Sequence, residues 1–571
     1  MSGFTRPQEK IVVKDTDTAT VDLLERELSV PRAIAKVLAA RNLSTFDECR
    51  TFFRPDVSHF HDPFLFKTMQ QVVERIASAI AKKEKIVVYG DYDVDGITAT
   101  VLMIRVLRAL GAECTHYLPN RLTDGYGLSE EGVRKIAESG TTLIITVDCG
   151  ISASREIEIA NCLGIDCIVT DHHELHQEVP PAYAVLDPKD PASGYPCRDL
   201  AGVGVALKVC QALARHFNHD TTLWEPYLDI VALGTAADIV PLTEENRVIA
   251  HMGFAAMMHT PHKGLQALIA QQGLGGKVIS TSQVVFQIAP CINAVGRLGT
   301  PDAGVALLLT DDEQEAEELA RLLRTTNGER RELDKAVAEE AHCWVEKNTD
   351  PENDNAIVAG SETWHAGVIG IVASKMVERY NRPAILFSIG TDGYARGSAR
   401  SIPALNMLEA LTECSDLLEG YGGHAAAAGM TIRTENIEAF RTRFNDVVGR
   451  KLAAEDFVPV VTADAEVPIP SITPKFFRII QQMEPFGPGN MRPVFLSSDV
   501  RHKSAPRLLG NAHVKMALVG EGIVMDAIAF NAGDRYRKIK EASRLSVAYS
   551  IDQNEWNGKV SLQMKVKGIS L

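Results

Sequence analysis

Residues 86–96 of the chain read IVVYGDYDVDG, a short apolar run of β-branched residues that is followed at once by acidic residues. Such a run is typical of a buried strand. The runs LIITVD (143–148) and IVTDHH (168–173) have the same form. In an open parallel sheet, the carboxyl ends of the strands meet at one edge, where ligands bind. We therefore expect one shared site that contains Asp91, Asp93, Asp95, Asp148, Asp171, His172 and His173.

The residue types at these strand ends indicate a metal site. Several carboxylates with few imidazoles suit Mn²⁺ or Mg²⁺ better than zinc or copper. An Asp-x-Asp-x-Asp-Gly run also opens a calcium-binding EF-hand loop, but that loop needs Glu at its twelfth position, which is Leu102 here. A plain acidic turn explains one such loop as well as a metal site does. It does not explain three acidic strand ends within about eighty residues.

Length and charge limit the class of protein. A chain of 571 residues is too long for one hydrophobic core, so we expect three or four domains. The net charge of −15 argues mildly against a nucleic-acid partner. Residues 499–571, however, contain 12 Lys and Arg against 7 Asp and Glu, a local charge of +5. A basic module on an acidic body is compatible with binding a polyanion.

Cysteine spacing and the absence of apolar spans indicate the compartment. Ten cysteines without a C-x-x-C pair argue against a zinc ribbon or a thioredoxin motif and are typical of reduced residues in a cytosolic protein. Residues 1–17 lack the apolar core of a signal peptide, and no apolar run approaches the length of a bilayer-spanning helix. We therefore expect a cytoplasmic protein with no membrane partner.

The order of strand and helix patterns predicts the architecture. Strands and helices alternate from 86 to about 187, which favours a parallel α/β sheet with right-handed crossovers. Residues 311–348 form a polar, Glu-rich segment with helical apolar spacing, and a second, Gly- and Ala-rich α/β module follows. Near the C-terminus, short runs such as VKMALV (514–519) suit a small antiparallel barrel.

Several motifs carry a resemblance to a known family. GDYDVDG (90–96), Asp148, DHH (171–173) and ALGTAADIVPL (232–242) together resemble the DHH phosphoesterase superfamily. Within it, the chain resembles the RecJ family of single-strand exonucleases over essentially its whole length. The further motifs of that family occur in the expected order: PNRLTDGYGLS (119–129), APCINAVGRLG (289–299), TWHAGVIGIVASK (363–375), RGSARS (396–401), GGHAAAAG (422–429) and EPFGPGN (484–490).

The resemblance implies an α/β fold with a parallel-sheet DHH catalytic domain, a smaller α/β DHH-associated domain joined to it by a long helix, and a C-terminal OB-fold β-barrel. We read EPFGPGN as a turn that orients this last domain. The expected bounds are 1–50 for a helical N-terminal lead-in, 51–310 for the DHH domain, 311–350 for the connecting helix, 351–455 for the DHH-associated nucleic-acid-binding domain and 456–571 for the OB-fold domain.

The resemblance also implies two divalent ions, Mn²⁺ or Mg²⁺. Asp93 and Asp148 are the implied ligands of one ion, and Asp95, Asp148, His172 and Asp238 those of the other, with Asp148 as the bridge. Asp91 is expected beside them. Two ions can clamp the attacking and the leaving oxygen of a phosphodiester. His173 is implied as a donor to the scissile phosphate.

Two arginines are implied contacts to substrate phosphates. Arg121 and Arg297 offer the planar fork that pairs with phosphate oxygens, although a surface or interdomain salt bridge is the usual role of an arbitrary arginine. The chain departs from the family at Cys291, where we expect an arginine, so end recognition is expected to depend more on Arg297.

The remaining nucleic-acid contacts are expected outside the DHH domain. In the second α/β module, Ser398, Arg400 and His424 are the side chains expected to touch the strand, while Trp364 and His365 either stack on bases or fill a seam between domains. In the OB-fold module, Lys515 is the main basic candidate. Arg535, Arg537 and Lys538 are further candidates, with Phe530 and Tyr536 as stacking platforms.

The resemblance thus implies a single-stranded-DNA-specific 5′-to-3′ exonuclease that releases 5′-mononucleotides in recombination and repair. It implies single-stranded DNA, a single-stranded-DNA-binding protein and a helicase as partners, and we expect a monomer. One alternative is a DHH phosphodiesterase for short oligoribonucleotides or cyclic dinucleotides, but the basic C-terminal module argues against it. Another is a non-catalytic replication scaffold of the same fold, although this chain retains every metal carboxylate that we can place.

Overall fold

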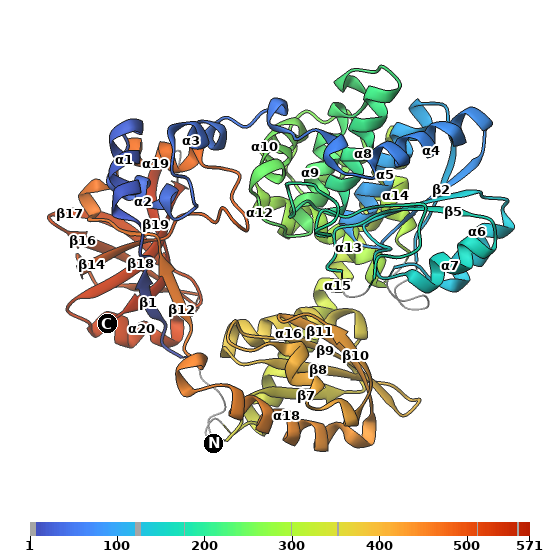
Figure 1. The fold of residues 1–571 in the computed structure, drawn as a ribbon. Coiled ribbons are helices and arrows are strands. Elements are labelled where there is room, and N and C mark those ends of the chain that lie inside the picture. Colours follow the sequence, from blue (N-terminus) through green and yellow to red (C-terminus); the bar gives the residue numbers. More distant parts are fainter. Residues whose placement is uncertain are drawn as a thin grey trace. The chain divides into compact units, whose positions relative to one another are not determined.

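The structure is a computed structural model, whose elements are shown in Figure 1. The chain forms two compact units. Unit 1 comprises residues 1–44, 328–480 and 493–571, and unit 2 comprises residues 45–327 and 481–492. Among the described residues, no helix is both long and apolar enough to cross a membrane. The structure describes residues 7–119, 127–175, 178–298, 300–350, 353–510, 512–556 and 559–571.

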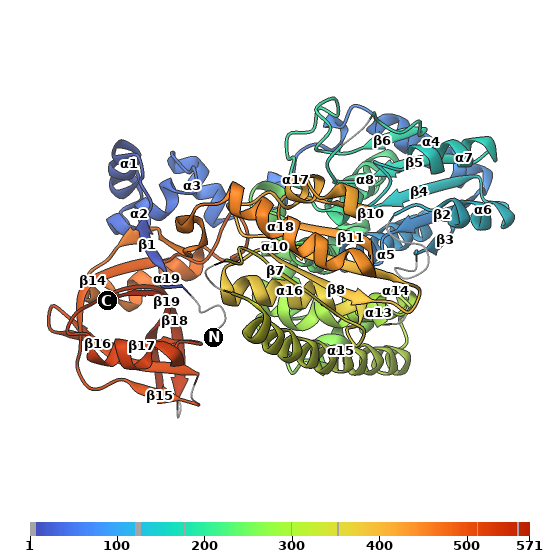
Figure 2. The same cartoon turned by 90° about the horizontal axis from the view of Figure 1, so that it is seen from below.

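Unit 2 contains a five-stranded sheet in which every neighbouring pair is parallel, as the alternating pattern predicts (Figure 2). Its strand order is β3-β2-β4-β5-β6. Each of these strands therefore ends at the same edge of the sheet. The strands are β2 (Lys85–Gly90), β3 (Glu113–Tyr117), β4 (Leu143–Val147), β5 (Asp166–Thr170) and β6 (Ala184–Leu186).

Both faces of this sheet are buried, which explains why its strands are continuously apolar. On β2, Ile86 and Val88 pack into one core, while Val87 and Tyr89 point to the other face and join a second core. The first core contains α4 (Met69–Lys82), α5 (Val94–Ala109), α8 (Gly202–His216), α9 (Leu228–Ala237) and α10 (Glu244–Met257). The second contains α6 (Glu130–Glu138) and α7 (Ser154–Cys162).

The rest of unit 2 is helical, with one segment that returns from far along the chain. Residues 484–490 form the predicted turn, closed by a bridge between Gly487 and Asn490. Arg247 of α10 donates to the carbonyls of Met483, Glu484 and Pro485. These bonds attach residues 481–492 to α10. The other helices include α3 (Phe46–Phe53), α11 (Lys263–Gln271), a π-helical turn (Val284–Ile288), α13 (Ala289–Leu298) and α14 (Asp302–Leu309).

Unit 1 contains a second, mixed sheet with strand order β10-β11-β9-β8-β7. Only β7 and β8 pair in parallel. The predicted long helix is α15 (Glu313–Asn348), which is shared between the two units. The strands are β7 (Ile357–Ser361), β8 (Ala384–Ile389), β9 (Tyr394–Arg400), β10 (Leu418–Gly423) and β11 (Ala427–Arg433), and the main helices are α16 (Ala366–Tyr380) and α18 (Ile437–Lys451).

The C-terminal part of unit 1 is a seven-stranded sheet with order β13-β14-β18-β19-β17-β16-β15. An added pairing of β14 with β16 closes part of it into a ring. The sheet is mixed rather than wholly antiparallel, because β13–β14 and β17–β19 pair in parallel. Its strands are β13 (Ala465–Glu466), β14 (Phe495–His502), β15 (Arg507–Leu509), β16 (His513–Gly520), β17 (Ile523–Ala529), β18 (Leu545–Trp556) and β19 (Lys559–Ser570).

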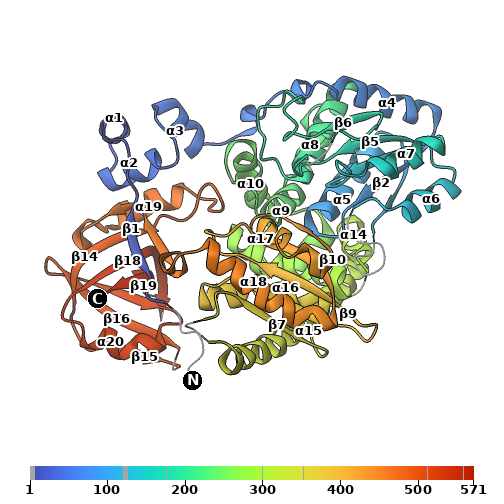
Figure 3. The ribbon, with the colours of Figure 1, turned by 60° about the horizontal axis from the view of Figure 1, so that its bottom comes forward.

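The N-terminal segment, which we expected to be helical, begins with a strand. β1 (Lys10–Val13) pairs in parallel with β12 (Val460–Ala463), and Figure 3 shows β1, in dark blue, beside the C-terminal strands. Arg535 strengthens this attachment through an ion pair with Glu9. The predicted helices follow as α1 (Thr18–Leu28) and α2 (Arg32–Ala39).

A buried ion pair holds part of the core of unit 2. Lys208 of α8 lies 2.8 Å from Glu245 of α10, and both side chains are 1% exposed. Lys208 also donates to the carbonyl of His61, and Tyr195 donates its hydroxyl to Glu245 at 2.6 Å. Both charges are buried and hydrogen-bonded. If one partner is removed, the other charge stays in the low-dielectric interior without a counter-charge.

Glu245→Leu should therefore destabilise unit 2 by about 3–5 kcal/mol, because Lys208 remains buried without its carboxylate. Urea-induced unfolding followed by circular dichroism measures this loss. Combining it with Lys208→Met should recover part of the stability, since no buried charge remains. The surface pair of Arg215 with Asp62 offers a control: Arg215→Met should cost at most about 1 kcal/mol. An equal loss in the single and double variants contradicts this account.

Candidate metal centre

The loop after β2 is shaped by its own acidic residues. Asp93 is the N-cap of α5, and its Oδ1 accepts from the backbone N–H groups of Asp95 (2.9 Å) and Gly96 (3.1 Å). A Cβ at Gly96 would lie 2.5 Å from the backbone oxygen of Asp91, so only glycine allows this turn. Asp91 is buried. The loop thereby holds three carboxylates within one helical turn of the strand.

Asp95 is oriented by a second helix. Its Oδ2 accepts from the N–H of Gly202 (2.7 Å) and its Oδ1 from that of Val203 (2.9 Å), the first two residues of α8. The N-terminus of a helix favours negative charge. Asp95 Oδ2 also lies 3.8 Å from Nε2 of His172.

Asp148 follows β4 and approaches both α8 and His172. Its backbone is in the left-handed region, with a φ of 61°, which aspartate tolerates better than most residues. Asp148 Oδ1 lies 3.0 Å from Nε2 of His172. A Cβ at Gly202 would lie 2.6 Å from both Cβ and Oδ1 of Asp148. The absence of a side chain at Gly202 is therefore what leaves room for Asp148.

Asp238 reaches the same edge from a helix rather than a strand. It lies just after the last residue of α9, and its Oδ2 is 3.6 Å from Nε2 of His172. The next residue, Ile239, has a φ of 63°, an unusual conformation for a β-branched residue. His172 Nε2 is thus within 4 Å of carboxylate oxygens from three separate segments.

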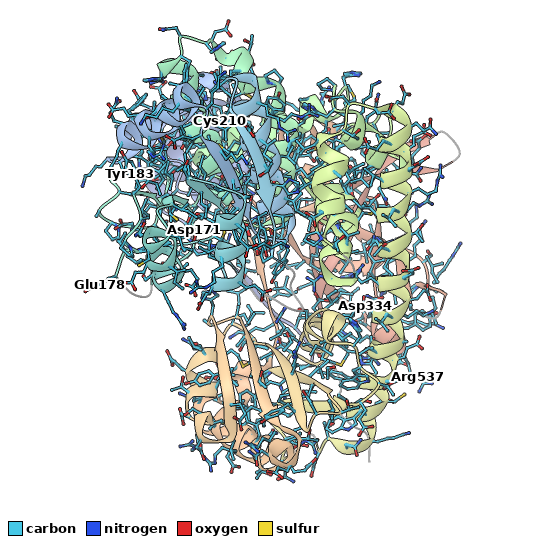
Figure 4. The ribbon with its side chains drawn as sticks, turned by 90° about the vertical axis from the view of Figure 1, so that its right-hand side faces the viewer. Asp171, Glu178, Tyr183, Cys210, Asp334 and Arg537 are labelled. Carbon is cyan, nitrogen blue, oxygen red and sulfur yellow. The ribbon has the colours of Figure 1, made fainter. Side chains whose placement is uncertain are left out.

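Asp171, which lies at the end of β5 (Figure 4), has a different role from the one its position suggests. Its Oδ2 accepts from the N–H of Ile151, and its Oδ1 accepts from the N–H groups of His172 and His173. Oδ1 also lies 2.6 Å from Nδ1 of His173. Both oxygens of Asp171 are therefore engaged, Oδ2 by the loop after β4 and Oδ1 by the loop that presents the two histidines.

The pKa values at this edge reflect crowded negative charge. Burial, followed by repulsion from neighbouring carboxylates, raises the pKa of Asp95 to about 7, that of Asp238 to about 9 and that of Asp148 well above its usual range. Burial and the neighbouring His173 lower the pKa of His172 to about 3, so its ring is neutral and able to bind a cation. Burial opposes protonation of His173, but its hydrogen bond to Asp171 and the nearby carboxylates raise its pKa to about 9.

This donor set fits divalent cations. Asp91, Asp93 and Asp148 offer ligand atoms within 4.8 Å of one another, and so do Asp95, His172 and Asp238. Asp148 also forms such a group with His172 and His173. Hard carboxylate oxygens with a neutral imidazole suit Mn²⁺ or Mg²⁺, and a cation offsets the repulsion that raises the carboxylate pKa values. All seven catalytic candidates from the sequence therefore lie at one edge of the sheet.

One buried carboxylate near this edge was missed by the sequence analysis. Asp187 directly follows β6 and is 1% exposed. Its Oδ1 accepts from the N–H of Lys189, while its Oδ2 has no hydrogen-bond partner among the described residues. Burial raises its pKa to about 7. The run AVLD (184–187) is an apolar strand followed by an aspartate, the same pattern that identifies Asp148. This pattern is the signal from which Asp187 could have been predicted.

The structure places one predicted phosphate contact beside the metal loop. Arg297 lies near the end of α13, and a Cβ at the preceding Gly296 would be 2.9 Å from the carbonyl oxygen of Tyr92. Cys291 of the same helix is in the core, where it accepts hydrogen bonds from Gln272 and Asn327. Arg121 lies outside the described residues.

In unit 1, the candidates of the second α/β module lie at one end of its sheet. Arg400 donates to Oγ of Ser398 at 3.2 Å, and both residues are on β9. Arg400 is opposite Ala427 of β11, whose carbonyl accepts from the N–H of His424. A Cβ at Gly370 of α16 would lie 2.8 Å from Ser398 Oγ, so this helix passes close to the pair.

The structure decides between the two roles considered for Trp364. Trp364 is 3% exposed, and its indole N–H donates to Glu340 of α15 at 2.9 Å. It fills a seam within unit 1 and is not available for stacking on a base. His365 is the N-cap of α16, where its Nδ1 accepts from the N–H of Gly367.

The OB-type sheet separates its basic candidates into two kinds. Lys515 is on β16, opposite Arg507 of β15, and is half-buried. Phe530 is half exposed, with its ring against the edge of His513. Arg535, in contrast, is engaged by Glu9 and by the carbonyl of Ile569, which makes it a structural residue.

Comparison with known families assigns a domain to each of the three larger sheets. Residues 85–235 match the DHH family N-terminal domain, residues 353–450 the DHHA1 domain and residues 463–568 the RecJ OB domain. These matches confirm the predicted combination of a parallel-sheet domain, a smaller α/β domain and a C-terminal OB domain.

Similar proteins and a similar solved structure extend this agreement over the whole chain. The single-stranded-DNA-specific exonuclease RecJ of Bacillus subtilis (strain 168) is 39% identical over 97% of this chain and 70% of its own length. That of Escherichia coli (strain K12) is 35% identical over 88% of this chain and 90% of its own length. The crystal structure of RecJ in complex with Mn²⁺ from Thermus thermophilus has a TM-score of 0.84 at 29% identity, and covers 99% of this chain and 80% of that chain.

The close approach of Gly202 to Asp148 provides a test of the centre. Gly202→Ala places a methyl group against Asp148 and should weaken Mn²⁺ binding by about 10–100-fold, the usual effect of disturbing a residue that supports a metal ligand. Isothermal titration with Mn²⁺ measures this change. Gly328→Ala in α15, where a Cβ meets nothing within 4 Å, should leave the affinity unchanged. Unaltered affinity in Gly202→Ala contradicts the assignment of Asp148 to the centre.

Proposed function

Because the chain belongs to the RecJ family of single-stranded-DNA-specific exonucleases, we propose that the acidic edge of its parallel sheet hydrolyses single-stranded DNA from the 5′ end and releases 5′-mononucleotides. The observation that supports the chemistry is the convergence on His172 of carboxylates from three segments. The relatives support single-stranded DNA as the substrate and a nuclease as the class of enzyme.

We propose the same division of ligands that the family resemblance implies. Asp93 and Asp148 hold one divalent ion, and Asp95, Asp148, His172 and Asp238 hold the other. The grouping of ligand atoms supports this division, and solved RecJ structures from Thermus thermophilus contain Mn²⁺ or Mg²⁺. Such ions, when bound, lower the pKa of a water molecule and stabilise the charge of the leaving oxygen.

The chain's own residues then orient the substrate and balance its charge. Asp171 keeps His173 protonated and fixes its Nδ1, which leaves Nε2 to donate to the scissile phosphate. Asp91 adds a carboxylate beside Asp93 and Asp148. A protonated imidazole and an anionic phosphate form a charge-assisted hydrogen bond, which is stronger than a neutral one.

Residues outside the acidic edge are proposed to hold the strand. We assign phosphate contacts to Arg297 and Arg121 in unit 2, and we assign Ser398, Arg400 and His424 in unit 1 to the same task. Lys515 is proposed as a contact of the OB domain, whose fold commonly binds single strands. From the family resemblance, we also propose that a single-stranded-DNA-binding protein and a helicase are partners and that the protein is a monomer.

Two other functions of the superfamily fit less well. A phosphodiesterase for short oligoribonucleotides or cyclic dinucleotides needs no OB domain for its substrate, yet residues 463–568 match one. A non-catalytic scaffold has no use for a full set of metal carboxylates, whereas this chain retains Asp93, Asp95, Asp148 and Asp238.

Asp148→Ala should lower the rate of cleavage by several orders of magnitude, because it removes a ligand from both proposed ions. The measurement follows release of mononucleotides from a 5′-labelled single strand in the presence of Mn²⁺. Asp166→Asn, at the opposite end of β5 and paired with Arg75, is the matched control and should retain full activity. Wild-type activity in Asp148→Ala overturns the site assignment, whereas inactivity of the wild-type chain overturns the function.

Arg297→Ala should lower the use of 5′-phosphorylated strands by about one to two orders of magnitude, since a fork contact to a doubly charged phosphate contributes roughly 1.5–3 kcal/mol. Strands with a 5′-hydroxyl should be affected much less. Comparing kcat/KM on the two kinds of strand measures the difference. Arg155→Ala, an exposed arginine paired with Glu130, should change neither. Equal losses on both strands assign Arg297 to an internal phosphate instead.

A further inference from the structure

A buried asparagine links two segments that each carry a metal candidate. Asn246 of α10 is 0% exposed. Its Nδ2 donates to the backbone carbonyl of Asp199 and, at 3.0 Å, to that of Pro241. These two carbonyls belong to different loops, so one amide group fixes the separation between them.

Each of the two loops leads directly into the metal centre. Pro241 comes three residues after Asp238, whose Oδ2 faces His172. Asp199 comes three residues before Gly202, whose N–H binds Asp95. A change in the distance between the loops therefore changes the distance between the carboxylates of Asp95 and Asp238.

The loop after Asp238 is also held from its other side. The N–H of Leu242 donates to the carbonyl of Pro488 at 2.7 Å. A Cβ at Gly487 would lie 2.6 Å from Leu242, and one at Gly489 would lie 2.8 Å from Thr243. The turn 484–490 therefore packs tightly against residues 241–243. The loop after Asp238 is therefore held between this turn and α10, and Asn246 supplies a hydrogen bond from α10 to it.

The hydrogen-bonding of Asn246 indicates that its two N–H groups are the functional part. Its Oδ1 is buried and has no hydrogen-bond partner among the described residues. A buried polar atom without a partner is unfavourable, so an asparagine at this position costs stability that an apolar residue of similar size does not. What an apolar residue cannot do is donate to both Asp199 and Pro241.

We infer that Asn246 is a positioning residue for the metal centre, which sets the spacing of Asp95 and Asp238 around His172. This inference depends on the metal site proposed above. Asn246 does not touch the metal candidates itself. It acts through the carbonyls of the two loops, in the way that groups behind a metal ligand fix the ligand's orientation.

Mn²⁺ binding to the full-length protein, followed by electron paramagnetic resonance of the free ion, tests this role. Asn246→Asp keeps the shape of the side chain but leaves at most one O–H donor for the two carbonyls, and should raise the dissociation constant of Mn²⁺ by about 10–100-fold. Asn246→Leu, which adds no charge, should raise it as well and guards against misfolding of the Asp variant. Cleavage of a single strand at saturating Mn²⁺ should recover in part.

The matched control is Asn445→Asp in unit 1, another buried asparagine, whose Oδ1 accepts from the N–H groups of Asn355 and Ala356. It should lower stability without changing the Mn²⁺ dissociation constant. A purely structural role for Asn246 lowers the number of binding-competent molecules but leaves their affinity unchanged, and that result overturns the inference. Failure of the wild-type chain to bind Mn²⁺ refutes the metal site itself.

Discussion

The structure depends on holding several carboxylates together at one edge of a buried sheet. Burial, and after it the repulsion between like charges at short range, raise the pKa values of Asp95, Asp148 and Asp238. The fold compensates in part with two helix N-termini, because Asp93 caps α5 and Asp95 receives the first N–H groups of α8. The protonated ring of His173 adds a positive charge. The remaining repulsion is what makes the edge a binding site for cations.

Close packing of the backbone fixes the positions of these carboxylates. Gly96 and Gly202 permit backbone and carboxylate to meet at distances that any side chain prevents. Asp148 keeps a left-handed backbone conformation between them. The same edge therefore combines electrostatic repulsion with tight steric limits, so the carboxylates cannot separate to relieve their repulsion. An acidic edge of this kind is preorganised for cations.

Local sequence patterns predicted the strands of the parallel sheet. The strands that precede Asp91, Asp148 and Asp171 were predictable, because a parallel sheet buried on both faces needs continuous apolar runs. Asp238 follows a helix, so only the family resemblance could identify it. The position of Asp171 alone cannot reveal that both of its oxygens accept backbone hydrogen bonds. Asn246 carries no local signal at all.

Long-range pairing explains the other differences. β1 pairs with β12, 450 residues further along the chain, and no local pattern specifies such a partner. The same holds for Arg535, which looks like a basic surface residue in the sequence yet is engaged by Glu9. Charge composition identifies a basic C-terminal module, but it cannot show that one of its arginines is held by Glu9 and the carbonyl of Ile569.

The return of residues 481–492 to unit 2 has a consequence for the order of events during synthesis. At about 5–20 residues per second, a ribosome needs roughly 10–50 s to pass from Arg247 to Met483. Throughout that interval the Arg247 guanidinium lacks its three carbonyl acceptors, and the loop beside Asp238 lacks the turn that packs against it. The acidic edge of a nascent chain therefore lacks this supporting turn until most of the polypeptide has been made, although α10, against which the turn packs, is made much earlier.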